Sequence, residues 1–294
     1  MILQDTRWLD DAEGARARVA RVLAVSQSYP ERAFAGVFAD VEPQTLEEWD
    51  CGGVPERRAL MQKLQGLFAR MGSAIPSPVK NKKSKEKDGE SRLQFTAALP
   101  WWLGSPSADI PEASPRRFFD SLDEIVVMAY GEPGGPRIGG SAQALRQHLE
   151  DPRLWRDIPP GKGIRIGLAT YEYASAADLL AVIKDLDRTF GRQKAYRGTA
   201  IFHATGPYGA PLTASVRGLV RDAAAVPVVH ASVKVGDREI ATNRCGRFVF
   251  RDLPAASVTL DVRGSGFQDV RVPVTGLTAG QELEIPPIVL QPNP

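Results

Sequence analysis

The first 205 residues alternate between short apolar runs and stretches with apolar residues at helical spacing. The helical spacing predicts helices over positions 11–25, 55–71, 141–150 and 175–190. The short apolar runs between them predict strands at positions 2–3, 34–41, 92–100, 124–130, 163–170 and 198–203. Strands that alternate with helices in this way indicate parallel βαβ units.

The pattern changes after Gly206, first to a stretch rich in Pro, Gly and Ala and then, beyond about position 226, to alternation with a period of two. A hairpin is predicted around Gly236-Asp237. Further strands are predicted at 247–250, 258–262, 270–274 and 288–290. We therefore expect a (β/α) domain over 1–205, a linker over 206–226 and a small all-β sandwich over 227–294.

Two acidic residues, Asp40 and Glu42, end the strand that begins at Phe34. Alternation places both side chains on the face opposite the aliphatic residues, which suit a layer against the helices. Residues two apart on a strand lie roughly 6.5–7 Å apart at Cα, so each carboxylate would shift the pKa of the other. One could then remain protonated as a general acid beside an ionised partner. The alternative is that the acids merely end the strand at solvent.

Other candidates follow the predicted strands, where parallel barrels carry their chemistry. A tyrosine hydroxyl could hydrogen-bond a sugar or a developing charge, and a tryptophan could form a platform for a sugar ring. Packing in the upper core is the alternative for these aromatic residues. The candidates are Tyr130 as a catalytic assistant, with Trp101, Trp102, Glu132, His203 and Trp8 as substrate-binding residues; Asp5 and Glu172 have weaker claims.

The charge balance argues against nucleic acid as a partner. The 37 basic and 35 acidic residues give a formal net charge of +2, spread along the chain. The lysine-rich stretch at 80–87 joins a helix to the next strand, away from the expected active-site end, and is predicted to be a solvated loop. The chain lacks a run of 18 apolar residues, so we expect no membrane span. Its N-terminus has no signal-peptide pattern.

Cys51 and Cys245 are the two cysteines of the chain, and they fall in segments assigned to different domains. That placement fits neither a zinc cluster nor a disulfide framework. We therefore expect two free or buried thiols, no metal site and no cofactor.

Two motifs resemble those of chitinase-type glycoside hydrolases. Gly36-Val-Phe-Ala-Asp-Val-Glu42 resembles their fourth-strand signature, and Val127-Met-Ala-Tyr130 resembles their sixth-strand motif. The order of residues from Trp8 to His203 also resembles uncharacterised bacterial proteins of this barrel type. The resemblance implies that Glu42 is the general acid, that Asp40 orients the substrate or supports its charge, and that Tyr130 assists. In such enzymes the substrate's own acetamido group is the nucleophile.

Three positions depart from the resemblance. Ala35 and Phe38 stand where the signature has acids, and Ala169 replaces an acid near the end of the seventh strand. The six predicted strands correspond to units 3–8 of a (β/α)8 TIM barrel, which needs eight units. We hypothesise that Met1 is an internal or truncated start, because an open sheet would leave bare edges. The alternative is that another chain closes the barrel.

The tail resembles the carboxypeptidase regulatory-like module, a transthyretin-like sandwich common in exported bacterial proteins. The resemblance rests on residues 242–254, on 258–262 and on Gly266-Phe267. The predicted fold class is therefore α/β, a partial (β/α)8 TIM barrel followed by a small all-β sandwich.

The sequence leads to two hypotheses of function. The first is a glycoside-hydrolase-like protein that acts on a bacterial polysaccharide or amino sugar by acid-assisted cleavage, in the periplasm or outside the cell. The second is a non-catalytic carbohydrate-binding or scaffold protein with a degenerate cleft. Both predict a carbohydrate partner, and neither specifies an oligomeric state.

Overall fold

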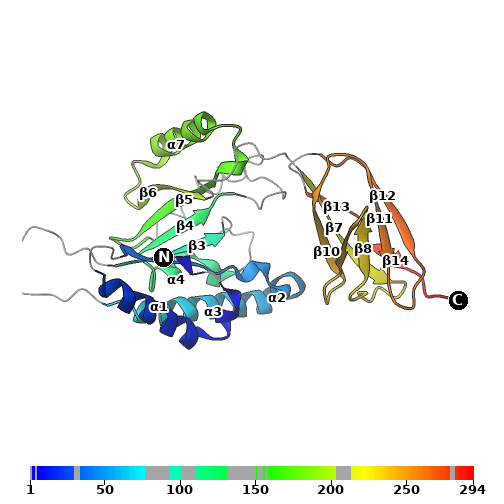
Figure 1. Ribbon diagram of the computed structural model, residues 1–294, viewed down its shortest axis with the longest axis horizontal. Helices are drawn as coiled ribbons and strands as arrows, with labels where there is room; N and C mark the ends of the chain where they lie inside the picture. Colours follow the sequence, from blue (N-terminus) through cyan, green and yellow to red (C-terminus); the bar gives the residue numbers. More distant parts are fainter. Residues whose placement is uncertain are drawn as a thin grey trace, which may run out of the picture. The chain divides into compact units, whose positions relative to one another are not determined.

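A computed structural model describes residues 2–3, 5–29, 34–76, 93–100, 110–130, 150, 155, 158–202, 213–278 and 282–294 (Figure 1). The chain forms two compact units. One contains a parallel sheet. The other contains the strands from Ala214 onward, together with Tyr130 and residues 169–179 among the described residues.

The parallel sheet follows chain order. Each strand lies beside the next one in the sequence, and the pairs from the first strand to the fifth are parallel. This sequential order is typical of βαβ units that progress in one direction. It confirms a mixed α/β unit, while closure into a barrel stays a prediction. The strands are β1 (Ile2–Leu3), β2 (Gly36–Asp40), β3 (Gln94–Pro100), β4 (Glu124–Met128), β5 (Gly163–Ala169) and β6 (Tyr196–Phe202).

Two of the long helices have clear start signals. At the start of α1 (Ala12–Gln27), the Asp11 carboxylate accepts a hydrogen bond from the Gly14 N–H group. At the start of α3 (Val54–Ser73), Glu56 reaches back to the Gly53 N–H group at 2.9 Å. These two helices pack together on one face of the sheet (Figure 1). The other α-helices in the described part of the chain are α2 (Glu47–Cys51), α4 (Pro115–Phe118) and α7 (Ala176–Phe190).

An aromatic cluster joins the helices to one face of the sheet. The Phe68 ring of α3 lies 5.9 Å from the Phe95 ring of β3 and 6.0 Å from the Phe118 ring of α4, both edge-on. All three side chains are buried. Phe95 pairs in register with Val37 of β2, so Val37 projects to the same face. This face of β2 and β3 is the apolar layer under α3.

A buried carboxylate fixes the loop after β3 to α3. Glu112, in the 3-10 helix η5 (Pro111–Ala113), accepts three hydrogen bonds of 2.8–3.0 Å from the guanidinium group of Arg58. The Gln65 amide group donates to the Glu112 carbonyl at 2.6 Å. Hydrogen bonding from Arg58 is the main reason why the pKa of Glu112 falls to about 2.

This pair should make the stability of the protein depend on acid pH. The folded-state pKa of Glu112 lies below its ordinary value of 4.5, so the stabilisation is present above pH 4.5 and is lost as the pH falls toward 2. We expect Glu112→Gln to be less stable than the wild type at pH 6 and to lose less stability on acidification. Urea unfolding from pH 6 to pH 2 measures this. The exposed Glu48→Gln is the control, and equal pH dependence of Glu112→Gln and the wild type would contradict the prediction.

The strands from Ala214 onward form two four-stranded sheets around an apolar core that includes Val216, Phe250 and Leu260. In one sheet β7 (Ala214–Asp222) pairs with β10 (Arg247–Leu253), β13 (Glu282–Glu284) and β14 (Ile288–Leu290). The other sheet has the order β12 (Val270–Val274), β11 (Val258–Arg263), β8 (Ser232–Val235), β9 (Arg238–Ala241). The predicted hairpin joins β8 to β9, with Gly236 at a positive φ of 58°.

One expected boundary differs from the structure, and two predicted segments lie outside the described residues. The stretch 206–226, expected to be a linker, contains β7, which pairs with three other strands of the sandwich. The Pro and Gly residues before β7 concealed its alternation. The predicted helix at 141–150 lies almost entirely outside the described residues, and the lysine-rich stretch at 80–87 lies wholly outside them. Among the described helices, none has the length and apolar character needed to cross a membrane.

Candidate functional site

Asp40 and Glu42 project from the face of β2 that does not contact α3. Val37, Ala39 and Val41 are at most 2% exposed, whereas Asp40 and Glu42 are half-buried. Val37 shares its face with Phe95 and therefore with α3, so alternation turns Asp40 to the other side of the sheet. The strand ends directly after Asp40, which places both acids at the carboxyl end of β2.

Neighbouring strands place both apolar and charged residues on this second face. Asp40 is in register with Ala98 of β3, a small residue, and Ala98 is in register with Val126 of β4. Further along the same row, Arg165 of β5 forms an ion pair of 2.6 Å with the buried carboxylate of Glu124. A buried carboxylate requires such a partner. The second face of the sheet therefore carries an ion pair beside apolar residues, whereas the face under α3 is apolar.

The two acids share a hydrogen bond between their carboxyl groups. Burial is the main reason why the pKa of Glu42 rises to about 6, and the negative charge of Asp40 and the hydrogen bond to it raise this pKa further. Burial also raises the pKa of Asp40, while the hydrogen bond from Glu42 opposes that rise. Burial and the neighbouring carboxylate thus favour the neutral form of Glu42. The neutral form is the one that a general acid needs.

The 3-10 turn η3 (Pro43–Thr45) fixes the backbone of Glu42. Pro43 starts the turn with its restricted φ. The Thr45 N–H and hydroxyl groups both donate to the Glu42 carbonyl, at 3.1 and 2.7 Å. The turn brings Gln44 back toward the acids, and its amide nitrogen donates to Glu42 Oε2 at 2.8 Å. Gln44 is a site residue that sequence reasoning missed. The polar residue two positions beyond Glu42 was the available signal.

Two oxygen atoms at this site have no hydrogen-bond partner among the described residues. They are Asp40 Oδ1 and Gln44 Oε1, and both are buried from solvent. A buried acceptor is normally satisfied by a donor, and leaving it unpaired is costly. Both oxygens therefore keep unused hydrogen-bond acceptor capacity.

The other predicted site residues are distributed along the chain. Trp8 is half-buried in the 3-10 helix η1 (Thr6–Leu9), and Tyr130 is half-buried two residues beyond the end of β4. Asp5 caps η1 and forms an ion pair with Arg7 at 2.8 Å, which lowers its pKa mainly through side-chain hydrogen bonding. Asp5 therefore has a local structural role. The remaining four, Trp101, Trp102, Glu132 and His203, lie outside the described residues.

The positions that depart from the chitinase-type pattern are apolar in the structure as well. Phe38 is half-buried on the same face of β2 as Asp40, and Ala169 is buried at the end of β5. Neither side chain can donate, accept or hold a charge. The candidate site therefore rests on the group Asp40, Glu42 and Gln44.

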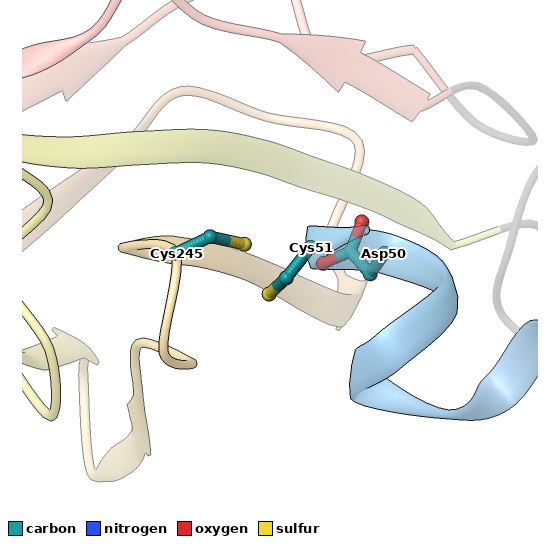
Figure 2. Close-up of side chains that lie close together, drawn as sticks. All are labelled: Asp50, Cys51 and Cys245. Carbon is teal, nitrogen blue, oxygen red and sulfur yellow. The ribbon is translucent and has the colours of Figure 1, made fainter. Parts of the chain in front are cut away.

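The expectation of two free thiols is wrong, because both cysteines are disulfide-bonded. Cys51 is the last residue of α2, and Cys245 lies in the turn before β10 (Figure 2). The prediction relied on assigning the two residues to different domains, which says nothing about the oxidation of a thiol. A disulfide-bonded sulfur has no thiolate for nucleophilic attack or metal binding, so neither cysteine adds chemistry to the candidate site.

Comparison with known families identifies the tail of the chain. Residues 215–291 match the model of the carboxypeptidase regulatory-like domain. This match agrees with the resemblance seen in the sequence and begins one residue after the start of β7. Among curated proteins none matches the chain.

Solved structures similar to the chain include glycoside hydrolases at low identity. Chitinase ChiA74 from Bacillus thuringiensis is 12% identical with a TM-score of 0.40, over 93% of this chain and 64% of that chain. A chitinase from Chromobacterium violaceum is 16% identical with a TM-score of 0.35, over 58% and 49%. The spore cortex-lytic enzyme SleL of Bacillus cereus is 16% identical with a TM-score of 0.37, over 58% and 36%. The chain thus spans less than two thirds of each.

Proposed function

We propose that this protein is a glycoside-hydrolase-like protein that cleaves a bacterial polysaccharide or an amino sugar with acid assistance. Glu42 is the proton donor and Asp40 is its ionised partner. The observation that supports this proposal most directly is the hydrogen-bonded carboxyl pair at the carboxyl end of β2, in which the pKa of Glu42 rises to about 6. A general acid works best when its pKa lies near the working pH.

The contact between the two carboxyl groups restricts the mechanism. Hydrolases with two catalytic carboxylates hold them about 5 to 9.5 Å apart, on opposite sides of the scissile bond. Asp40 and Glu42 hydrogen-bond each other, so they would lie on the same side of that bond. Glu42 would protonate the leaving oxygen, and the attacking group would come from elsewhere. The substrate's own acetamido oxygen, as in chitinase-type enzymes, fits this arrangement, with Asp40 supporting the positive charge that develops.

A second candidate function is carbohydrate binding without cleavage. It is favoured by Phe38 and Ala169, which replace acids of the hydrolase pattern with apolar side chains. In that case the half-buried polar side chains of Asp40, Glu42 and Gln44 bind sugar hydroxyl or amide groups. Both proposals keep the other roles predicted from the sequence. Tyr130 is the predicted catalytic assistant, and the predicted substrate-binding residues are Trp8, Trp101, Trp102, Glu132 and His203.

Turnover of a panel of chromogenic glycosides and polysaccharides separates the two functions. We expect the wild type to cleave at least one member, Glu42→Gln to cleave none, and the exposed Glu48→Gln of α2 to behave as the wild type. Binding of the same sugars is measured by calorimetry. Sugar binding without turnover in all three proteins would favour the binding module, and neither binding nor turnover would exclude both functions.

We place the protein in the periplasm or outside the cell. Both cysteines are disulfide-bonded, and structural disulfides persist in oxidising compartments. Titration with a thiol reagent after unfolding without reductant checks this oxidation state and should detect no free thiol. The sandwich over residues 215–291 has no assigned chemistry, and spacing the α/β unit from a surface is the role we assign to it.

A further inference from the structure

Gln44 contacts the carboxyl group of the proposed proton donor, Glu42, as a hydrogen-bond donor. Its amide nitrogen lies 2.8 Å from Glu42 Oε2, and both side chains are half-buried. An amide N–H group can donate a hydrogen bond but cannot accept one. Glu42 Oε2 therefore acts as an acceptor whether Glu42 is neutral or ionised. In neutral Glu42 the proton is carried by the other oxygen, Oε1.

The η3 turn makes this contact specific to Gln44. Thr45 holds the Glu42 carbonyl with two hydrogen bonds, and Pro43 restricts the first residue of the turn. The Gln44 side chain thus approaches a fixed backbone rather than a flexible one. A rotation of the Glu42 carboxyl group would break its hydrogen bond with Gln44.

From this geometry we propose that Gln44 is a positioning residue for Glu42: its amide group holds Oε2 and leaves Oε1 to carry the proton that is transferred. This inference rests on the proposed function. Gln44 also stabilises the ionised form of Glu42, because a hydrogen-bond donor favours a carboxylate over a neutral acid. The effect of Gln44 on the pKa of Glu42 is accordingly downward.

In the described part of the chain, Asp40 and Gln44 are the two residues whose side chains shift the pKa of Glu42. Helices α2 and α3 pack against η3 and bring charged residues to the same end of the sheet. None of these residues is among the causes of the Glu42 shift. On the sheet, Arg165 lies three strands from β2, roughly 14 Å away, and is paired with Glu124. The charged residues of α2 and the start of α3 are Glu47, Glu48, Asp50, Glu56 and Arg57.

Two substitutions test the proposal without relying on turnover. Gln44→Met keeps the length of the side chain but removes the donor, and Gln44→Glu keeps the shape but adds a negative charge. The probe is a pH titration of the glutamate side-chain carbons by NMR, with Glu42 assigned through Glu42→Gln. In Gln44→Met the pKa of Glu42 should rise from about 6 to about 7. In Gln44→Glu the carboxyl cluster should keep its last proton to a still higher pH.

Gln27→Met, an exposed position at the end of α1, is the matched control and should leave the titration unchanged. Thermal unfolding verifies that each variant is folded. If Gln44→Met does not fold, the isosteric Gln44→Glu decides the question. A Glu42 titration that is unchanged or lowered in the folded variants would overturn the proposal.

The same variants have a kinetic signature on any substrate that the wild type cleaves. We expect kcat of Gln44→Met to fall by about tenfold or more, because a misplaced donor transfers its proton less well. Its KM should change little. The basic limb of its pH profile should move up with the pKa of Glu42, whereas a merely structural role would lower the rate without moving that limb. If no substrate is cleaved, the proposed cleavage fails, and the NMR titration still decides the role of Gln44.

Discussion

Glu42→Gln should lower kcat/KM by about 10³-fold, the usual contribution of a general acid, and should make the folded protein more stable at neutral pH. The folded pKa of Glu42 is raised from 4.5 to about 6, so ionising it costs more in the folded state than in the unfolded state. That cost is present above pH 6 and disappears as the pH falls from 6 to 4.5. Gln44 can still hydrogen-bond the new amide group.

The gain in stability should be about 1 kcal/mol at pH 7.5, after allowance for the partial exposure of Glu42. Urea unfolding of the wild type and of Glu42→Gln at pH 4 and pH 7.5 measures it, with Glu48→Gln as the control. A catalytic group that is unfavourable for folding gives opposite signs for rate and stability. Loss of activity together with lower stability at pH 7.5 would indicate that Glu42 is a structural residue.

The fold of the α/β unit could be predicted because its signals are local. The buried strands read as short apolar runs, and Asp11 and Pro43 mark the start of α1 and the end of β2 in the sequence itself. The strand β7 could not be recognised in the same way. Its partners β10, β13 and β14 lie 25 or more residues later in the chain, and the preceding Pro and Gly residues are typical of a linker.

Strand alternation predicts the part of the candidate site that lies before Pro43. A period of two places Asp40 on the face opposite Val37, and the structure has this arrangement. Alternation ends at Pro43, where the chain turns into η3. The contact between Gln44 and Glu42 arises from that turn, so no strand or helix pattern indicates it. The oxidation of the cysteines depends on the compartment and on three-dimensional proximity, and neither is encoded in spacing alone.

Phe68→Ala should lower the free energy of unfolding by about 3 to 5 kcal/mol, a large part of the stability of an ordinary domain. The Phe68 ring is fully buried and contacts Phe95 and Phe118 from different elements. Removing it leaves a cavity that three separate elements would have to fill. Denaturant unfolding followed by circular dichroism measures the loss, with Leu180→Ala on α7, 53% exposed, as the control.

This measurement also tests the geometry of the site. Phe95 is in register with Val37, and Val37 lies three residues before Asp40. If Phe68 and Phe95 form the buried layer under α3, the Asp40 side chain must project to the opposite face of the sheet. A loss in Phe68→Ala no larger than in Leu180→Ala would contradict that layer. The direction of Asp40 and Glu42 would then lose its structural basis, and so would the proposed proton transfer.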